Sequence, residues 1–441
     1  MPTDPVHERP VDLLSDLVGF DTTNPPGDER ACVEYVEDLL TDAGLETERL
    51  AADPDRPNLL ARLPGGDEAP PLLLQGHVDV VPTEGQAWEH PPFSGVVEDG
   101  YVWGRGTLDM KSGVAMMLSA VLRAAAEGLE PAGDVLLLIL VDEEAGGDLG
   151  AKYVVENHAE TFADVEYAIG EFGGFPLRLA GSTFYPIQVA EKQVCWLRAT
   201  FTGEGGHASD PQRDGPMHAL GEVLTRLTER RLPVRVTPAA EAFVEALAEE
   251  ADGAEADRLR ALLDPERTDE TLDAMGEEAA RLDAMLHDTA SPTVVEGGSK
   301  INVHPSEVTL RVDGRLLPGV TPDEFLAEVR DAVGDVDGVA FEVERHDESG
   351  SEVDLGMFDL LADVLEQQDP EAVPAPYLLT AATDARFFDR LGVQTYGFTP
   401  LDLPPEFDFM SLAHAANERV PVEAVEFGAD ATYRVLERYG E

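Results

Sequence analysis

Histidine and carboxylate side chains come directly after several short apolar runs of the sequence. His77 and Asp79 follow the first of these runs. Glu143 and Glu144 follow a second run, and Glu171 follows a third. Histidine nitrogens and carboxylate oxygens, without thiolates, are the ligand types of catalytic zinc sites that keep a coordination position open. Because an acid at the end of a buried strand is costly unless it faces solvent or a metal, the joint occurrence of these residues predicts a metal site.

Each of these groups has a simpler interpretation when it is taken alone. A His-x-Asp pair is usually a surface turn, and two adjacent acids are usually the solvated exit of a strand. Asp109 lies in a glycine-rich segment just before a predicted helix, and aspartate is a common N-cap residue. Gly104 and Gly106 in that segment do not complete a dinucleotide-binding fingerprint, and this disfavours an oxidoreductase.

The elements that must position these residues alternate between buried strands and helices. Continuous apolar strands separated by amphipathic helices are typical of a sheet that is covered on both faces. In open sheets of this kind, sites form at the carboxyl ends of the strands. The sequence therefore predicts an α/β fold with the metal site at one edge of a central, mostly parallel sheet. Strands are expected at 71–75, 134–141, 165–169 and 393–398, and helices at 11–20, 30–43 and 109–127.

The middle of the chain follows a different pattern. Without a helical insertion at about 238–290, its order is β-α-β-β-α-β, which predicts a small antiparallel sheet with two helices on one face. We place this inserted α+β domain at 188–347 and the catalytic domain at 1–187 and 348–441. The expected strands are 193–202, 293–303, 307–315 and 339–345, and the expected helices are 216–231 and 322–333.

The composition is that of a folded and strongly acidic protein. Hydrophobic residues make up 43% of the 441 residues, enough for the cores of two or three domains. The 88 acidic residues outnumber the 31 basic ones and give a net charge of −57, which would repel nucleic acid and anionic membranes. Because the acids are spread over the whole length, we expect a halophilic host, whose salt would screen this repulsion.

The N-terminus and the cysteines indicate the compartment. The first residues, MPTDPVHERP, lack the basic and apolar regions of an export signal. No apolar run approaches the roughly 20 residues of a membrane helix, so we expect a soluble, cytoplasmic protein. Cys32 and Cys195 are the only cysteines, and we expect both to be reduced, buried thiols.

Several sequence blocks occur in a fixed order from about Leu13 to the C-terminus. They are QGHVDVVP, WEHPPFSG, DGYVWGRGTLDMK, VDEEAGG, GEFGG, GGHAS and AHAANE. In this order and spacing the sequence resembles peptidase family M20. That family includes acetylornithine deacetylase, succinyl-diaminopimelate desuccinylase, aminoacylase, glutamate carboxypeptidase and carboxypeptidase S. The stretch 88–113 is most similar to the branch of carboxypeptidase S and the N-acyl-amino-acid hydrolases.

The resemblance implies a phosphorylase/hydrolase-like catalytic domain that binds two divalent metal ions. Zinc is the expected ion, with cobalt and manganese as alternatives. Asp109 would bridge the two ions. His77 and Glu171 would complete one metal site, and Glu144 and His414 would complete the other. A bridging carboxylate holds two such ions about 3.5–4 Å apart.

The resemblance also implies residues that act on the substrate. Glu143 would be the general base, and Asp79 would orient a metal-ligating histidine. His207, which alone would be interpreted as a loop histidine, would reach an active site, often that of the partner subunit, and stabilise the oxyanion. Asn302 and Arg315 would contact the substrate, and the guanidinium fork suits a carboxylate.

These expectations together predict an amidohydrolase that cuts an amide bond next to a free carboxylate. It would be a carboxypeptidase or an N-acyl-amino-acid deacylase, acting on a small peptide or an N-acyl amino acid as a homodimer through the inserted lid domain. One alternative is a biosynthetic deacylase of the acetylornithine or succinyl-diaminopimelate type. The other is a metal-binding dimer without catalysis, which the presence of Glu143 disfavours. Asp384 and Arg386 are left open as substrate-side residues or a structural ion pair.

Overall fold

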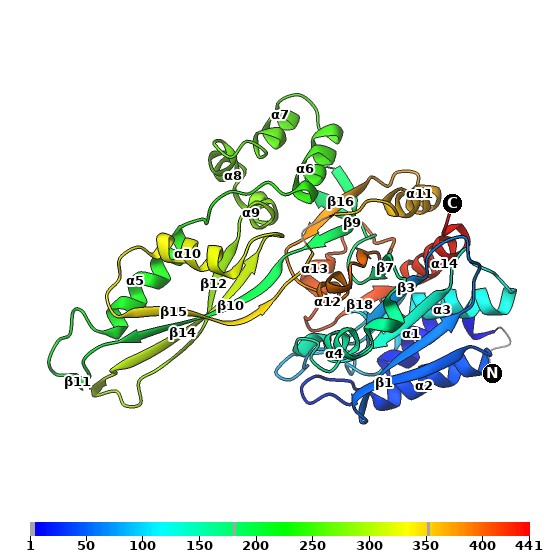
Figure 1. Ribbon diagram of the computed structural model, residues 1–441, viewed down its shortest axis with the longest axis horizontal. Coiled ribbons are helices and arrows are strands. Elements are labelled where there is room, and N and C mark those ends of the chain that lie inside the picture. Colours follow the sequence, from blue (N-terminus) through cyan, green and yellow to red (C-terminus); the bar gives the residue numbers. More distant parts are fainter. Residues whose placement is uncertain (1–4, 180–181, 351–352) are drawn as a thin grey trace. The chain divides into compact units, whose positions relative to one another are not determined.

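The protein is described by a computed structural model that covers residues 5–179, 182–350 and 353–441 (Figure 1). The chain divides into two compact units. Unit 2 interrupts the sequence of unit 1 twice, first after Val189 and again, for a short stretch, after Tyr377. Unit 1 comprises Met1–Val189, Asp354–Tyr377 and Thr383–Glu441, and unit 2 comprises Ala190–Val353 and Leu378–Ala382.

The central sheet lies mainly in unit 1. Its strand order is β1-β2-β6-β3-β7-β17-β9-β16, and β8 pairs with β9. Strand β3 is parallel to both of its neighbours, and β17 is parallel to β7. The α/β class with a mostly parallel sheet is therefore confirmed. The strands are β1 Glu46–Asp53, β2 Arg56–Leu63, β3 Leu72–His77, β6 Val135–Leu140, β7 Tyr167–Gly170, β8 Leu177–Leu179, β9 Ser182–Glu191, β16 Pro374–Leu379 and β17 Gln394–Gly397.

Helices pack on both faces of this sheet because its central strands are apolar on both sides. Leu73 of β3 lies in a core cluster with side chains of α4 and α12. At Gly76 an added Cβ would meet the opposite face, 3.1 Å from Val114 of α3, so the absence of a side chain helps this helix to pack closely on the sheet. The helices are α1 Pro10–Val18, α2 Arg30–Asp42, α3 Lys111–Glu127, α4 Ala151–Asn157, α11 Phe358–Gln368, α12 Ala385–Phe388, α13 Phe409–Leu412 and α14 Val422–Arg438.

A three-stranded sheet of unit 1 brings the C-terminal region close to the loop before α3. Strand β5 pairs with both β4 and β18, in the order β18-β5-β4. Because β18 lies directly after the AHAANE block, this pairing draws that block toward the residues that precede Asp109. The strands are β4 Val97–Glu98, β5 Tyr101–Trp103 and β18 Arg419–Pro421.

Unit 2 has the predicted β-α-β-β-α-β order around an antiparallel sheet, β12-β14-β10-β15. Alternate residues such as Leu310 of β14 and Phe201 of β10 are buried, as are Val223 of α5 and Phe325 of α10. The expected sheet with two helices is therefore confirmed. The elements are β10 Gln193–Thr202, β11 Gly206–His207, α5 Pro216–Glu229, β12 Thr289–Gly297, β13 Val303–His304, β14 Glu307–Leu316, α10 Pro322–Val333 and β15 Val339–Asp347.

The helix-rich stretch of unit 2 forms a small group of helices between α5 and β12 (Figure 1). Its own apolar side chains are buried, among them Phe243, Leu259 and Leu282. The stretch therefore has a core of its own. Its helices are α6 Pro238–Glu250, α7 Ala254–Ala261, α8 Thr268–Met275 and α9 Ala280–Leu286.

One predicted strand, 293–303, is confirmed only in its first part, because β12 ends at Gly297. The segment forms the end of β12 and the short strand β13, with a turn between them. Gly298 has φ +72°, and Val303 N donates a hydrogen bond to Lys300 O at 3.2 Å. This tight turn ends the extended run, and β13 then pairs with β11 instead of continuing along β14.

Two simpler predictions concern the cysteines and the membrane. Cys32 and Cys195 are both free and buried, as expected. Burial raises the pKa of the Cys32 thiol to about 11, so this thiol is unreactive at neutral pH. Within the described ranges, the helices are all too short or too polar to cross a membrane.

Candidate metal centre

The five predicted metal ligands come from five separate elements of unit 1. Four of them lie in or next to buried strands or a buried helix, whereas His414 follows α13, which has no buried residue. His77 is the last residue of β3, Asp109 precedes α3, Glu144 lies in the short helical turn Glu143–Ala145 after β6, Glu171 follows β7, and His414 follows α13.

Asp109 lies between the two histidines and presents a different oxygen to each. Its Oδ1 is 3.2 Å from His77 Nε2, and its Oδ2 is 3.0 Å from His414 Nε2. Glu171 Oε2 approaches His77 Nε2 to 3.4 Å, and Glu144 Oε1 approaches His414 Nε2 to 3.2 Å. The structure therefore brings all five predicted ligands together, with the carboxylate of Asp109 at the centre.

The ligand atoms form two groups, each small enough for one cation. Asp109, Glu144 and His414 offer atoms that lie within 4.8 Å of one another. The same holds for the group His77, Glu143 and Glu171. The resemblance implies only proton transfer for Glu143. In the structure its carboxylate also lies close enough to His77 and Glu171 to share a cation with them.

Asp79 supports the first histidine from behind. His77 Nδ1 is 3.0 Å from the carbonyl oxygen of Asp79, which can only accept, so Nδ1 carries the hydrogen and Nε2 is free to bind a metal. The carboxylate of Asp79 accepts hydrogen bonds from the backbone N–H groups of Glu143 and Glu144, both at 3.1 Å. It accepts a further bond from Asn24 Nδ2 at 2.8 Å. Asp79 thus holds the histidine through its backbone carbonyl and the acidic turn through its carboxylate.

The acids of this site repel one another, and their pKa values reflect it. Burial raises the pKa of Glu144 to about 7, and the negative charge of Asp109 adds to the rise. Burial also raises the pKa of Glu171 well above its ordinary value. For Asp109, burial acts in the same direction, but hydrogen bonds from His414 and His77 outweigh it and hold its pKa below the ordinary value.

This charge pattern and donor set fit divalent cations. Hydrogen bonds to Asp109 and Glu144 raise the pKa of His414 to about 10. A cation that binds His414 Nε2 would therefore displace a proton from this nitrogen. Imidazole nitrogens with carboxylate oxygens suit zinc, and they also accept cobalt or manganese. A cation in each group would offset the repulsion among the carboxylates.

Glu143 lies next to a buried charge of opposite sign. Its Oε1 is 3.7 Å from Arg386 Nη1, and the same guanidinium donates to the carbonyl oxygens of Thr383 and Gly146. Burial raises the pKa of Glu143, while the charges of His77 and Arg386 oppose the rise. The role of Arg386 beside Glu143 is one that the sequence left open.

Two buried residues that the sequence did not single out lie behind Asp109 and His414. Arg105 and Glu418 form an ion pair with no exposed surface. Each lies in a sequence block that also contains a predicted metal ligand, DGYVWGRGTLDMK for Arg105 and AHAANE for Glu418. A second charged residue within a ligand block is the signal that could have found them.

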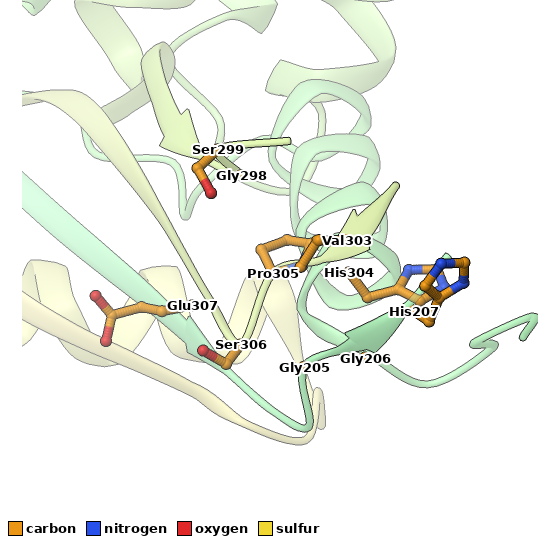
Figure 2. Close-up of a pocket in the computed structure, with 10 residues that line it drawn as sticks. All are labelled: Gly205, Gly206, His207, Gly298, Ser299, Val303, His304, Pro305, Ser306 and Glu307. Atoms are coloured by element: carbon orange, nitrogen blue, oxygen red, sulfur yellow. The ribbon is translucent and has the colours of Figure 1, made fainter. Parts of the chain in front are cut away.

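The three remaining candidates lie in unit 2. His207 is exposed on β11, and its Nδ1 accepts a hydrogen bond from the backbone N–H of Ser209 at 3.2 Å. Because Nδ1 accepts, the hydrogen of the ring is on Nε2, which is then a donor. Figure 2 shows His207 and His304 side by side at an open cavity of about 680 Å³ that Ser299 and Glu307 also line.

Asn302 and Arg315 are held within unit 2 as well. Asn302 is exposed in the turn before β13, and its carbonyl oxygen accepts a hydrogen bond from Ala208 N at 3.1 Å. Arg315 on β14 donates to both carboxylate oxygens of Asp313, at 2.9 and 3.3 Å. A substrate carboxylate would therefore have to compete with Asp313 for this guanidinium.

Comparison with known proteins gives consistent results. A sequence profile of the peptidase family M20/M25/M40 matches residues 73–438. The probable carboxypeptidase S-like 2 of Dictyostelium discoideum is 28% identical over 384 residues, which cover 83% of this chain and 71% of the relative. The human N-fatty-acyl-amino acid synthase/hydrolase is 29% identical over 369 residues, covering 81% of this chain and 71% of the relative. The M20 family metallo-carboxypeptidase Sso-CP2 from Sulfolobus solfataricus has the same fold, with a TM-score of 0.69 at 17% identity over 98% of this chain and 99% of that one.

Proposed function

The chain belongs to the peptidase family M20/M25/M40 and is a hydrolytic enzyme, and we propose that it uses two divalent metal ions to cleave an amide bond next to a free carboxylate. The substrate would be a small peptide or an N-acyl amino acid. The observation that carries this proposal is the position of Asp109, whose two oxygens face His77 and His414 separately, at 3.2 and 3.0 Å.

The residues that would hold the metals divide into two sets that share Asp109. His77 and Glu171 would hold one ion, and Glu144 and His414 the other. When bound, two such ions supply Lewis acidity that activates a water molecule and polarises the scissile carbonyl. The chain itself supplies a fixed set of ligands, because Asp79 locks the orientation of the His77 ring.

Glu143 is the candidate general base. Its carboxylate is largely buried, and burial raises its pKa above the ordinary value, which is the direction that makes a carboxylate a stronger base. It would take a proton from water and give it to the departing amine. Arg386 limits this rise and holds the loop from which Glu143 projects, through the carbonyl of Gly146. A base at this place is what a non-catalytic metal-binding relative would be expected to lack.

The substrate-side roles are assigned to residues of unit 2. His207 presents Nε2–H as a donor, which suits an oxyanion. Arg315 offers a guanidinium fork, and its present partner, Asp313, is itself a carboxylate. The carbonyl oxygen of Asn302 accepts a hydrogen bond from the backbone N–H of Ala208, the residue after His207. Together they support a substrate with a carbonyl to polarise and a carboxylate to bind. A homodimer through unit 2, a halophilic host and a cytoplasmic location stay predictions.

The test is turnover by the zinc-loaded protein in high salt. The panel contains N-acyl amino acids and dipeptides, each as the free acid and as the C-terminal amide. We expect hydrolysis of free acids and at least a tenfold lower kcat/KM for the amides, because a lost charge-assisted fork is worth about that much. Equal rates for acid and amide would refute the carboxylate requirement. No hydrolysis of any member would refute the assigned reaction.

A further inference from the structure

A fully buried ion pair joins the chain segments that carry Asp109 and His414. Arg105 lies in the loop before α3, and Glu418 lies just before β18. Both residues have 0% of their surface exposed, and Arg105 Nη1 pairs with Glu418 Oε2. The two residues are 313 positions apart in the chain, so the pair connects distant segments at one point.

Glu418 holds the backbone at Asp109. Its Oε1 accepts hydrogen bonds from Leu108 N at 2.7 Å and from Asp109 N at 3.4 Å. Its carbonyl oxygen accepts another from Gly104 N at 3.0 Å. Because these bonds fix the chain just before the ligand and at the ligand itself, they determine the point from which the carboxylate of Asp109 projects.

Arg105 holds the backbone at His414. Its Nη2 donates to the carbonyl oxygen of His414 at 2.9 Å, and its Nη1 donates to that of Ala415 at 3.2 Å. Gln86 completes the arrangement, because its Oε1 accepts from Arg105 Nη2 at 2.9 Å and its Nε2 donates to His414 O at 3.0 Å. His414 has φ +65°, a conformation uncommon for a residue with a Cβ, so its backbone relies on such bonds.

Arg105 and Glu418 make these contacts to backbone groups and not to the ligating side-chain atoms of Asp109 and His414. Arg105 and Glu418 are therefore placed to act through the ligands and not on the metal. Resting on the proposed two-metal function, we propose that the Arg105–Glu418 pair is a positioning device: it sets the separation of Asp109 and His414, and thereby the affinity of the metal site that they form with Glu144. Residues that support metal ligands in this way typically change metal affinity by about 10- to 100-fold when they are replaced.

The experiment is a zinc titration of the full chain against a competing chelator, with Glu418→Gln as the main variant. This change keeps the shape of the side chain and removes its charge. For wild type we expect two tight equivalents. For the variant we expect one of them to weaken by about 10- to 100-fold and the other by less. A folded Glu418→Gln protein that binds both equivalents as wild type does would overturn the proposal.

Asp288→Asn in unit 2 is the matched control. Asp288 is also buried, and it also accepts one backbone N–H, from Leu317 at 2.6 Å, and one guanidinium, from Arg235 at 2.9 Å. We expect this variant to lower the melting temperature without changing either zinc equivalent. If it weakens zinc binding as much as Glu418→Gln does, general destabilisation explains the loss, and the proposal is overturned.

Gln86→Leu decides the matter if Glu418→Gln does not fold. Gln86 is only half-buried, so its replacement is tolerated more easily, yet it removes a hydrogen bond to His414 O and one to Arg105. We expect one equivalent to weaken by roughly tenfold, and unchanged binding would overturn the proposal. Failure of wild type to bind two zinc ions would instead overturn the proposed function, and with it this inference.

Discussion

The chemistry-bearing residues of the two units are held in different ways. In unit 1, His77 is 1% exposed, and its ring is fixed by contacts with Asp79, Asp109 and Glu171. In unit 2, His207 is exposed and bonds to Ser209 two residues away. The candidate ligand His77 is thus held by the core of unit 1, whereas His207, which is assigned to the substrate, is held by a local turn of unit 2. The comparison predicts that metal binding and turnover can be separated by mutation.

The largest effect is expected in unit 1 for Glu143→Gln. Loss of the general base should lower kcat by about 10²- to 10⁴-fold, because the side chain that would transfer a proton from water to the leaving amine is removed. Zinc content should stay close to two per chain, since the five ligands are unchanged. Steady-state kinetics and elemental analysis of the same preparation check both statements. Glu160→Gln, at an exposed acid, is the control, and a Glu143→Gln rate above a tenth of its rate would contradict the role.

In unit 2, His207→Ala should lower kcat by about 10²- to 10³-fold, the usual effect of removing one oxyanion donor. Because His207 is exposed and outside the metal groups, the melting temperature and zinc content should not change. Ser209→Ala should give a smaller loss in kcat, since it removes only the hydroxyl contact to Nδ1. Loss of zinc in His207→Ala would break the comparison between the units.

The buried charges of unit 2 should affect stability and leave metal binding intact. Burial lowers the pKa of Lys192 to about 7, far below its value in the unfolded chain. Between pH 7 and 9 this lysine therefore binds more protons in the unfolded chain than in the folded one, and its contribution to the free energy of unfolding should rise with pH by about 2 kcal/mol. His414, whose pKa is raised to about 10, contributes in the opposite direction when no cation is bound. Denaturant unfolding at both pH values checks this. Relative to wild type, Lys192→Met should lose this contribution, whereas Lys300→Met, at an exposed lysine, should keep it. A rise of equal size in Lys192→Met would show that another group is responsible.

The smallest effect is expected for Arg315→Lys. It keeps the charge but removes the fork, so KM for a free-acid substrate should rise about tenfold while kcat and zinc content change little. Arg311→Lys on the same strand is the control, because Arg311 pairs with Glu296 and Glu344 on the sheet face. If Arg315→Lys and Arg311→Lys behave alike, Arg315 has no special role in binding the substrate.

Three of the five candidate metal ligands, His77, Glu144 and Glu171, can be located in the sequence because they stand at strand ends, whereas His414 rests on the resemblance. His77 ends one buried strand and Glu171 follows another, the apolar runs of both strands are visible in the sequence, and parallel strands bring such ends to one edge. The supporting pair was missed because Arg105 and Glu418 are far apart in the chain, and nothing in an isolated sequence shows which arginine meets which acid. The break in the strand 293–303 was missed because Ile301 in the turn and Val303 after it continue the apolar pattern.

The most direct measurement is anomalous diffraction at the zinc edge from crystals of the zinc-loaded protein. Two peaks are predicted within unit 1, one on each side of the Asp109 carboxylate, the first in contact with His77 and the second with His414. A single peak, or zinc bound away from Asp109, would contradict the claim that five separated side chains form one two-metal site.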